Sequence, residues 1–390
     1  MLTAGKTNFL CALTLLCIGV IMVHSAGLSV GGGNPVTLES IVFSRSTAYL
    51  LIAVTAMACG ALLPIADFAR PRCLARWTPA LIPLLLIAIV SVYVPLVGHE
   101  VNGASRWLRV PGTSFTFQPS ELAKWGLVLV VAWYGRRFAS SLSKFFSGLL
   151  PILMIVGTIA AIIALEDLGT AFLITGVCSL MLIASGARVR HFLMLAPAGI
   201  AAFVGFVMTS DYRVRRMTSF INPYEDPDGA GYHIIQSMVA IANGDVTGRG
   251  LGFGLQKFGY LPEDQTDFLF SIIAEELGLA GVSLILAIYV MLLFAGLSVA
   301  KKQADLMLRL VALGVTLTVS FQACMNLLVV TGLMPTKGIA LPLLSSGGTG
   351  WILTALCLGL LISMDRTASH ATLEHVAPDS NELAPGAVPA

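Results

Sequence analysis

The sequence predicts an all-α, polytopic membrane protein with about ten transmembrane helices and a large extracytoplasmic loop between the seventh and eighth helices. Composition is the first observation behind this prediction: 56% of the 390 residues are hydrophobic and 11% are charged, and the mean hydropathy is +0.86. A soluble domain carries about 25% charged residues. The second observation is that apolar runs near the ~20 residues needed to cross hydrocarbon recur along the chain. We expect no nucleic-acid partner.

Ten apolar runs give the predicted spans. They cover residues 9–25, 48–66, 80–97, 120–134, 148–165, 170–186, 191–209, 267–298, 306–334 and 340–364. The run at 120–134 is short and contains Glu121 and Lys124, whereas the run at 267–298 is longer than one crossing requires. Helices at both places therefore need particular attention.

Basic residues in the short loops predict the orientation, because Lys and Arg in such loops stay in the cytoplasm. With ten spans they fall on one side: Lys6, Arg70, Arg72, Arg76, Arg136, Arg137, Lys144, Arg188, Arg190, Lys301, Lys302, Arg309 and Arg366. Both termini are then cytoplasmic, and the polar loops at about 98–119 and 210–266 are extracytoplasmic. The spans form one transmembrane domain, residues 1–366, followed by a cytoplasmic tail, 367–390, whose Ala, Pro and acid content is typical of disorder.

The stretch 261–278 contains the first candidate for chemistry. It ends the second polar loop and opens the eighth span, so we expect Asp267 where water gives way to hydrocarbon. A charged side chain placed in hydrocarbon without a partner costs at least ~2.5–3.5 kcal/mol, which is why intramembrane carboxylates usually have a function. Asp267 is therefore the candidate for chemistry in this stretch.

The interpretation of the neighbouring acids depends on helical geometry. If the residues after Asp267 are helical, Glu275 lies roughly 12 Å deeper on a neighbouring face, and Glu276 points to nearly the opposite side. Glu275 is then the candidate for support. The alternative is that Asp264, Thr266 and Asp267 simply cap the helix N-terminus, where acids suit the helix dipole. The local pattern favours neither interpretation.

Basic residues enter the membrane near the first polar loop. Arg106 lies in this loop, and Lys124 lies one turn inside a helix that Pro119 or Ser120 begins. Basic residues near span ends are commonly snorkelling anchors. Lys124, however, follows Glu121 by three residues and so has an intrahelical partner within the membrane. An outward-facing cationic pocket suits an anionic head group such as a phosphate.

The loop at 211–266 is longer than a connection needs to be, and such loops are usually functional or disordered. Its composition favours order, and residues 233–242 are apolar enough for an amphipathic helix against the membrane. The glycines at 244–254 allow close approach of the backbone to a ligand, although Gly-rich stretches are more often plain loops. They match no nucleotide-binding fingerprint because no strand precedes them.

Three further polar features stand out. Glu166 and Asp167 mark the turn between the fifth and sixth spans, where adjacent acids are ordinary turn polarity. Asn326 lies within an apolar span, and residues 332–350 then contain two prolines and several glycines. These predict broken helix, which a membrane protein tolerates only where the backbone is buried in protein or lines a cavity.

Together these blocks resemble the SEDS family, the shape, elongation, division and sporulation proteins typified by FtsW, RodA and SpoVE. The resemblance runs in chain order through NGASRWL, FQPSELAK, EDLGT, NPYEDPDGAGY, GRGLGFGLQK, YLPEDQTDF, AEELG and GLMPTKGIALPLLSSGG. NPYEDP and TKGIALP look closer to the FtsW/SpoVE branch than to RodA. Two positions depart from the family pattern: Glu166 stands where Pro is frequent and Ser346 where Tyr is usual.

The resemblance implies a peptidoglycan glycosyltransferase of the bacterial cytoplasmic membrane. It would polymerise lipid II, the undecaprenyl-pyrophosphate-linked disaccharide peptide, at the outer face during division or cell-shape growth. The family further implies a divalent cation, Mg²⁺ or Mn²⁺, with no ligands assigned here. It also implies assembly with a class B penicillin-binding protein transpeptidase and other divisome or elongasome membrane proteins.

The resemblance also assigns site residues. The family's essential loop carboxylate matches Asp267, and its Arg and Lys beside the donor site match Arg106 and Lys124. Further substrate-binding candidates are Glu121, Gln118, Arg249 and Lys337, and the supporting candidates are Glu275, Asp167 and Ser345.

The implied mechanism uses Asp267 as general base on the sugar 4-hydroxyl of the acceptor. Arg106, Lys124 and the cation would stabilise charge that develops on the pyrophosphate. Two other classes of function remain. A lipid II flippase would need a polar path facing inward, yet the strongest polar clusters lie in the outer loops. A non-enzymatic divisome scaffold would not need Asp267 or Lys124.

Overall fold

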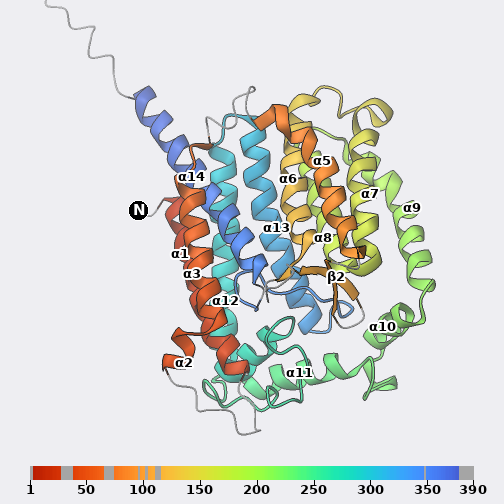
Figure 1. Ribbon diagram of the computed structural model, residues 1–390, viewed down its shortest axis with the longest axis vertical. Helices are drawn as coiled ribbons and strands as arrows, with labels where there is room; N and C mark the ends of the chain where they lie inside the picture. The colour runs from red at the N-terminus through yellow and green to blue at the C-terminus, as the bar shows by residue number, and fades with distance from the viewer. Residues whose placement is uncertain are drawn as a thin grey trace, which may run out of the picture.

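The protein is a bundle of long helices with a layer of loops and short elements at one end (Figure 1). The computed structural model describes residues 3–27, 38–65, 74–94, 97–101, 104–109, 116–346 and 348–376. The long helices are α1 (Ala4–Ala26), α3 (Arg45–Leu62), α5 (Leu74–Val90), α6 (Pro119–Arg137), α7 (Leu150–Glu166), α8 (Leu168–Ala184), α9 (Val189–Met208), α12 (Leu269–Lys302), α13 (Leu306–Val330) and α14 (Thr349–Val376). Each expected apolar run coincides with part of one of these helices, which confirms the fold class.

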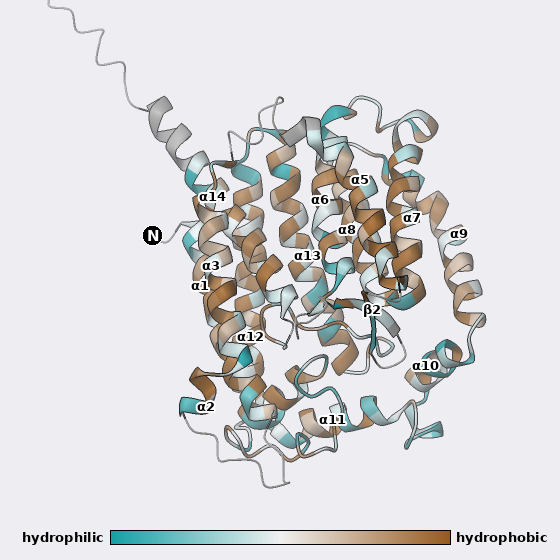
Figure 2. Cartoon of the chain, viewed as in Figure 1, coloured by the Kyte–Doolittle hydropathy of each residue, from teal (hydrophilic) through white to brown (hydrophobic). Residues whose placement is uncertain are grey.

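The long helices differ in how plainly they suit a membrane. In the described part of the chain, 7 helices are long and apolar enough to cross one, while α5 and α8 supply shorter apolar helices. Apolar residues dominate the bundle, and hydrophilic residues gather toward its two ends (Figure 2). The helix α6 begins at Pro119 as expected and carries Glu121 in its first turn. The number of ten spans stays a prediction.

The end that carries the short elements is called the loop end below. Here β1 (Gly98–Val101), β2 (Ala104–Arg109) and β3 (Thr116–Phe117) form an antiparallel sheet in the order β1-β2-β3. The register pairs Leu108 with Gly98 on one side and with Phe117 on the other. This sheet was not expected from the sequence, and it positions Arg106 beside the first turn of α6.

The second polar loop is ordered throughout. It contains α10 (Asp211–Ile221), η3 (Pro223–Glu225) and α11 (Tyr232–Gly244). The predicted amphipathic helix at 233–242 is thus confirmed as α11. Its Ser237 Oγ donates to Val330 O of α13 at 2.6 Å and lies 2.7 Å from Ser271 Oγ of α12, so α11 packs across the ends of both helices.

The helix α12 explains the long apolar run at 267–298. Its Gly278 has φ 61° and ψ −158°, so two helical pieces meet there. The first piece begins only at Leu269, after the N-cap residue Phe268, and no side chain caps it. The interpretation of Asp264, Thr266 and Asp267 as helix caps is therefore wrong. Because Asp267 precedes the helix, a helical wheel drawn from it does not describe the two glutamates either.

The helix α13 lies at the centre of the bundle, where it packs against α12, α6, α8 and α14. The first helix, α1, packs against α12 and α14, and its Leu15 and Leu16 are fully buried. The last helix continues to Val376, past the expected domain boundary at 366, and residues 377–390 lie outside the described residues.

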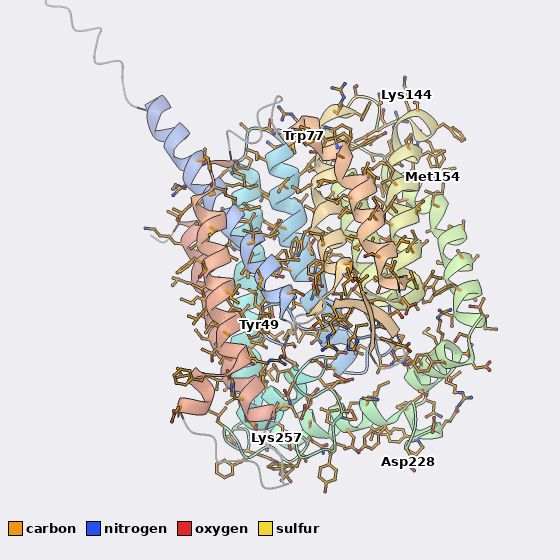
Figure 3. The ribbon with its side chains drawn as sticks, viewed as in Figure 1. Tyr49, Trp77, Lys144, Met154, Asp228 and Lys257 are labelled. Atoms are coloured by element: carbon orange, nitrogen blue, oxygen red, sulfur yellow. The ribbon has the colours of Figure 1, made fainter. Side chains whose placement is uncertain are left out.

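The end opposite the loop end is basic. Arg136 and Arg137 close α6, and Lys301 and Lys302 close α12. Lys144 lies at this end, and Asp228 lies at the loop end (Figure 3). The distribution agrees with a cytoplasmic basic end, although the orientation itself stays a prediction. Three of the basic residues used for that prediction, Arg70, Arg72 and Arg76, have side chains outside the described part.

Candidate active site

A cavity of about 820 Å³ lies at the loop end, between the sheet, α10, α11 and the segment that joins α13 to α14. It brings together seven of the expected site residues, namely Arg106, Gln118, Glu121, Asp167, Asp267, Lys337 and Ser345. A second cavity of about 440 Å³ shares Arg106, Asp167 and Lys337 and reaches Phe203 and Val207 on α9. The two together connect the polar groups with an apolar helix face.

Asp267 is the carboxyl group of the cavity whose pKa is raised most. Burial raises its pKa from 3.8 to about 7, and the neighbouring carboxylates Glu263 and Asp167 add to the rise. The guanidinium groups of Arg106 and Arg216 oppose it. None of the ion pairs found among the described residues includes Asp267. A carboxylate with this pKa near neutral pH suits a general base.

The backbone around Asp267 is fixed by Asn326, the polar residue within an apolar helix. Its Nδ2 donates to Asp267 O at 2.7 Å and to Ile339 O at 2.8 Å. One amide on α13 thus joins the loop before α12 to the segment before α14. The adjacent Gly338 lies close to both charged groups, because a Cβ there would be 3.2 Å from Asp267 Oδ2 and 3.3 Å from Arg106 Nη1.

The acidic turn at Glu166 and Asp167 has a structural role and also borders the cavity. Arg106 Nε donates to Glu166 O at 2.9 Å, and Ser105 N donates to Glu166 Oε2 at 3.0 Å. Asp167 caps α8, since its carboxylate accepts Thr170 N at 3.0 Å and Thr170 Oγ1 at 2.7 Å. The turn therefore anchors the strand that carries Arg106.

Lys124 does not line the cavity, because it is committed to buried partners. Its Nζ lies 2.8 Å from Glu121 Oε2 and 2.8 Å from Gln322 Oε1, and the residue is 3% exposed. Gln322 Nε2 in turn donates to Ala340 O at 2.9 Å. The contact of Lys124 with the cavity thus runs through Glu121 and Gln322, which line it.

Cations that the sequence did not single out also face the cavity. Arg215 and Arg216 of α10 line it, and Arg216 Nη1 donates to Thr336 O at 3.4 Å. Lys337 lies 4.9 Å from the centre of the Phe172 ring, and burial lowers its pKa while Asp167 opposes that change. Arg215 and Arg216 could have been noticed as basic residues in a long extracytoplasmic loop. Basic residues in long loops do not report membrane orientation, so another role could have been sought for them.

His233 of α11 is a further residue that sequence reasoning missed. It lines the cavity, and its ring stacks on Phe268, the residue after Asp267, with 5.7 Å between ring centres. Burial lowers its pKa, Arg216 adds to the fall and Glu263 opposes it. The lowered pKa favours the neutral form of the imidazole. From the sequence, His233 was identified only as the first residue of the predicted amphipathic helix.

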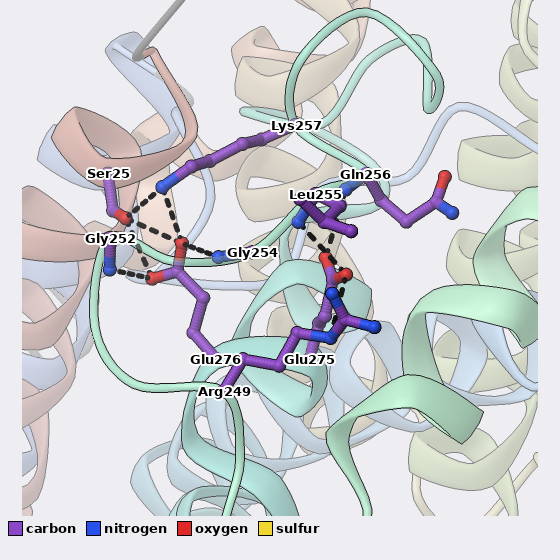
Figure 4. Close-up of polar contacts among 9 residues, drawn as sticks. All are labelled: Ser25, Arg249, Gly252, Gly254, Leu255, Gln256, Lys257, Glu275 and Glu276. Carbon is purple, nitrogen blue, oxygen red and sulfur yellow. Dashed lines mark hydrogen bonds and ion pairs between the residues drawn. The ribbon is translucent and has the colours of Figure 1, made fainter.

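The remaining two expected residues lie elsewhere. Arg249 Nε is 3.8 Å from Glu275 Oε1, and the Glu275 carboxylate also accepts the backbone amides of Leu255 and Gln256 (Figure 4). Neither Arg249 nor Glu275 lines the cavity. The glycines at 244–254 do allow close approach, but the partner is α12: a Cβ at Gly248 would lie 2.2 Å from Glu276 O.

No metal cage is evident in the described part of the chain. It holds no group of three or more His, Cys, Asp or Glu side chains that could bind an ion. Mg²⁺ commonly needs only one or two carboxylates when substrate phosphates and water complete its shell. The carboxylates of the cavity fit that sparse mode of binding, and they do not fit a structural metal site.

The comparison with known proteins decides the family. The sequence profile of the cell cycle proteins FtsW, RodA and SpoVE matches residues 6–370. The chain belongs to the FtsW/RodA/SpoVE family. Among its relatives, a probable peptidoglycan glycosyltransferase FtsW from Geobacter sp. (strain M18) is 37% identical over 90% of this chain and 94% of its own. The stage V sporulation protein E of Bacillus subtilis (strain 168) is 38% identical over 91% of this chain and 94% of its own.

Solved structures place this FtsW/RodA/SpoVE family member in the same fold. A chain from a structure described as "Structural coordination of polymerization and crosslinking by a peptidoglycan synthase complex" matches with a TM-score of 0.72 and 26% identity, over 93% of this chain and 97% of that one. The rod shape determining protein RodA of Thermus thermophilus matches with a TM-score of 0.61 and 25% identity, over 93% and 96% of the two chains.

Proposed function

We propose that this protein is a peptidoglycan glycosyltransferase that polymerises lipid II at the outer face of the bacterial cytoplasmic membrane. One observation carries the proposal: Asp267, with a pKa of about 7, lies in a cavity lined by the cations Arg106, Arg216 and Lys337. A base beside a group of cations suits a reaction in which a hydroxyl attacks and a pyrophosphate leaves.

In the proposed reaction the 4-hydroxyl oxygen of an acceptor lipid II attacks the anomeric carbon of the donor glycan. Asp267 takes the hydroxyl proton, the new glycosidic bond forms, and the bond from the anomeric carbon to the pyrophosphate oxygen breaks. The leaving undecaprenyl pyrophosphate keeps the electron pair. Arg106 and Arg216 stabilise its charge, while Lys124 acts through Glu121 and Gln322. A positioned base contributes about 10²–10⁴-fold to such a reaction.

A divalent cation, Mg²⁺ or Mn²⁺, belongs to the proposal as an aid to pyrophosphate departure. The ion would neutralise phosphate charge as a Lewis acid. It would be held mainly by the pyrophosphate oxygens and by water, with at most one or two carboxylates of the cavity, because the described residues offer no cage.

The apolar part of the substrate and the partner protein complete the proposal. The second cavity, which reaches Phe203 and Val207 on α9, would take the polyprenyl chain. A class B penicillin-binding protein would pack against α12 or α13. The exposed residues Val290, Met291 and Phe294 give α12 an apolar outer face for its single span.

Two other classes of function are less well supported. A flippase needs polar groups along a path through the bundle, whereas the cavity groups gather at the loop end. A scaffold for division proteins needs no carboxylate with a raised pKa. Purified protein in vesicles, given labelled lipid II, separates the three: polymer forms, label crosses the bilayer, or neither occurs.

The decisive variant is Asp267→Asn. Loss of the base should lower turnover at least about a hundredfold, while a helix-capping role, which the structure excludes, would leave turnover nearly normal. Because the pKa of Asp267 is raised on folding, its contribution to the stability of the folded protein is fully present below the pKa of the unfolded chain. This contribution is lost as pH rises through about 7. The variant should therefore melt at the same or a higher temperature than wild type at neutral pH. Wild-type polymerisation by Asp267→Asn would refute the mechanism.

A further inference from the structure

Two adjacent glutamates of α12 hold the segment 249–257 of the second polar loop in place (Figure 4). Lys257 Nζ lies 2.7 Å from Glu276 Oε1, and both side chains are completely buried. The same carboxylate accepts Ser25 Oγ of α1 at 2.7 Å and Gly252 N at 3.0 Å. A single carboxylate therefore joins the end of α1, the loop and α12.

The backbone makes a second set of contacts at the same place. Arg249 N donates to Glu275 O at 3.0 Å, and Gly250 N donates to Glu276 O at 2.9 Å. On the other side of the break at Gly278, Leu279 N donates to Asp245 O at 3.1 Å. The loop thus supplies hydrogen-bond partners to α12 where the helix is interrupted.

The ion pair itself is weak evidence for stability. Burying two charges costs several kcal/mol each, and apolar replacements of such pairs are often neutral or stabilising. What the pair of Lys257 and Glu276 provides is a unique docking position, because the lysine finds its counter-ion at only one place on α12. Shifting the loop by one residue would leave two buried charges without a counter-ion.

Docking at Lys257 leads directly to Asp267. Leu261 N donates to Gln256 O at 2.9 Å, and Phe268 N donates to Glu263 O at 3.1 Å. The chain between Lys257 and Asp267 therefore consists of successive hydrogen-bonded turns. At its far end this stretch enters α12 at Leu269. The segment that carries Asp267 is therefore held on α12 at both ends.

We infer that the Lys257–Glu276 ion pair, together with Ser25, positions Asp267 in the cavity. Lys257 and Glu276 are positioning residues, since neither lines the cavity. The inference rests on the proposed role of Asp267 as base. It assigns a mechanistic purpose to Glu276, which a helical wheel drawn from Asp267 places on the wrong side.

The test compares Glu276→Gln with a control at the ion pair that joins the other end of α12 to α14. Lys302 Nζ of α12 lies 2.7 Å from Asp365 Oδ1 of α14, so Asp365→Asn also removes a carboxylate from a lysine pair, here one whose lysine is exposed and which lies far from the cavity. Displacing a reacting group by about 1 Å can cost about a hundredfold in rate. Glu276→Gln should lower kcat about tenfold to a hundredfold with KM for lipid II nearly unchanged, and Asp365→Asn should keep kcat.

A pH profile separates positioning from general loss of folded protein. Asp267 is faced by Glu263, Asp167, Arg106 and Arg216, and burial is the main cause of its raised pKa. A loosened segment lets water in, so the acid limb of kcat/KM should move to lower pH in Glu276→Gln. Asp365→Asn should leave the limb in place, because a smaller folded fraction scales the profile without shifting it.

Two further variants guard against misfolding and coincidence. Ser25→Ala removes only one hydrogen bond, and it should shift the acid limb in the same direction by less. Lys257→Met combined with Glu276→Gln should cost no more than the worse single change, because both act through one contact. Multiplying losses in the double variant would overturn the inference.

Hydrogen exchange gives a readout that does not need activity. The amides of Gly252, Gly254 and Leu255 donate to the two glutamates, so they should exchange faster in Glu276→Gln than in wild type or Asp365→Asn. Unchanged exchange, or a normal kcat and acid limb beside an inactive Asp267→Asn, would refute the positioning role. An active Asp267→Asn would refute the proposed function instead.

Discussion

At the scale of single residues, the surroundings of Asp267 decide how the site responds to pH. Its carboxyl has a pKa of about 7 because burial and the nearby Glu263 and Asp167 oppose ionisation. A general base works only when ionised, so kcat/KM for lipid II should fall as pH drops through about 7. Polymerisation rates measured from about pH 5 to about pH 9 would show this limb. A rate that is flat through neutral pH would contradict the assignment.

The cavity contains Asp267, which the sequence singled out, and also neighbours that the sequence did not single out. Asp267, Arg106 and Gln118 could be found because polar groups at a membrane boundary are rare and costly. Arg216 could not be found, because its distance from Asp267 depends on how α10 folds back over the bundle. Lys124 was found, yet its burial between Glu121 and Gln322 depends on the packing of α6 against α13.

At the scale of elements, the break in α12 is the feature that most depends on single glycines. Gly278 has φ 61°, and a Cβ there would lie 2.3 Å from Gly248 N. Gly278→Ala should therefore destabilise the fold by at least about 1–3 kcal/mol through backbone strain and lower the melting temperature in detergent.

The matched control for that variant is Gly157→Ala in α7. A Cβ at Gly157 meets nothing within 4 Å, and Ala favours a helix over Gly by about 1 kcal/mol. Its melting temperature should match or exceed that of wild type. Equal melting temperatures for the two variants would show that the break needs no glycine.

Periodicity predicted the long helices and α11, because an apolar run or an apolar face follows from the residues alone. The break at Gly278 could not be predicted in this way, since AEELG continues a helical pattern. The backbone hydrogen bonds at the break join α12 to Asp245, Arg249 and Gly250, which lie 26 to 34 positions earlier in the chain. Local pattern contains no information on such a partner.

At the scale of the whole molecule, the orientation can be tested with single cysteines. Asp245 is exposed at the loop end and Arg188 is exposed before α9, close to the basic end. In a background without accessible native thiols, Asp245→Cys should react with an impermeant thiol reagent in intact cells and Arg188→Cys should not. Labelling at position 188 would reverse the orientation proposed for the site.

Dependence on a partner is the second prediction at this scale. The described residues form a helical bundle with a loop layer, so lengthening a glycan is the only polymer chemistry that we propose for them. Polymerisation by the purified protein should be weak, and a single-span class B penicillin-binding protein should stimulate it. Full activity that no such protein changes would count against the partnership. The variant Phe294→Arg should lose the stimulation by the partner, because Phe294 is exposed on the apolar outer face of α12.

The interrupted α12 also bears on how the protein is made. A ribosome delivers residues 244–254 before it delivers Glu275, Glu276 and Leu279, whose backbone atoms those residues contact. The glycine-rich stretch is therefore already synthesised when α12 emerges. Without it the backbone at Gly278 would have unpaired amides and carbonyls, which hydrocarbon does not tolerate. The order of synthesis along the chain thus supplies each polar partner before the group that needs it.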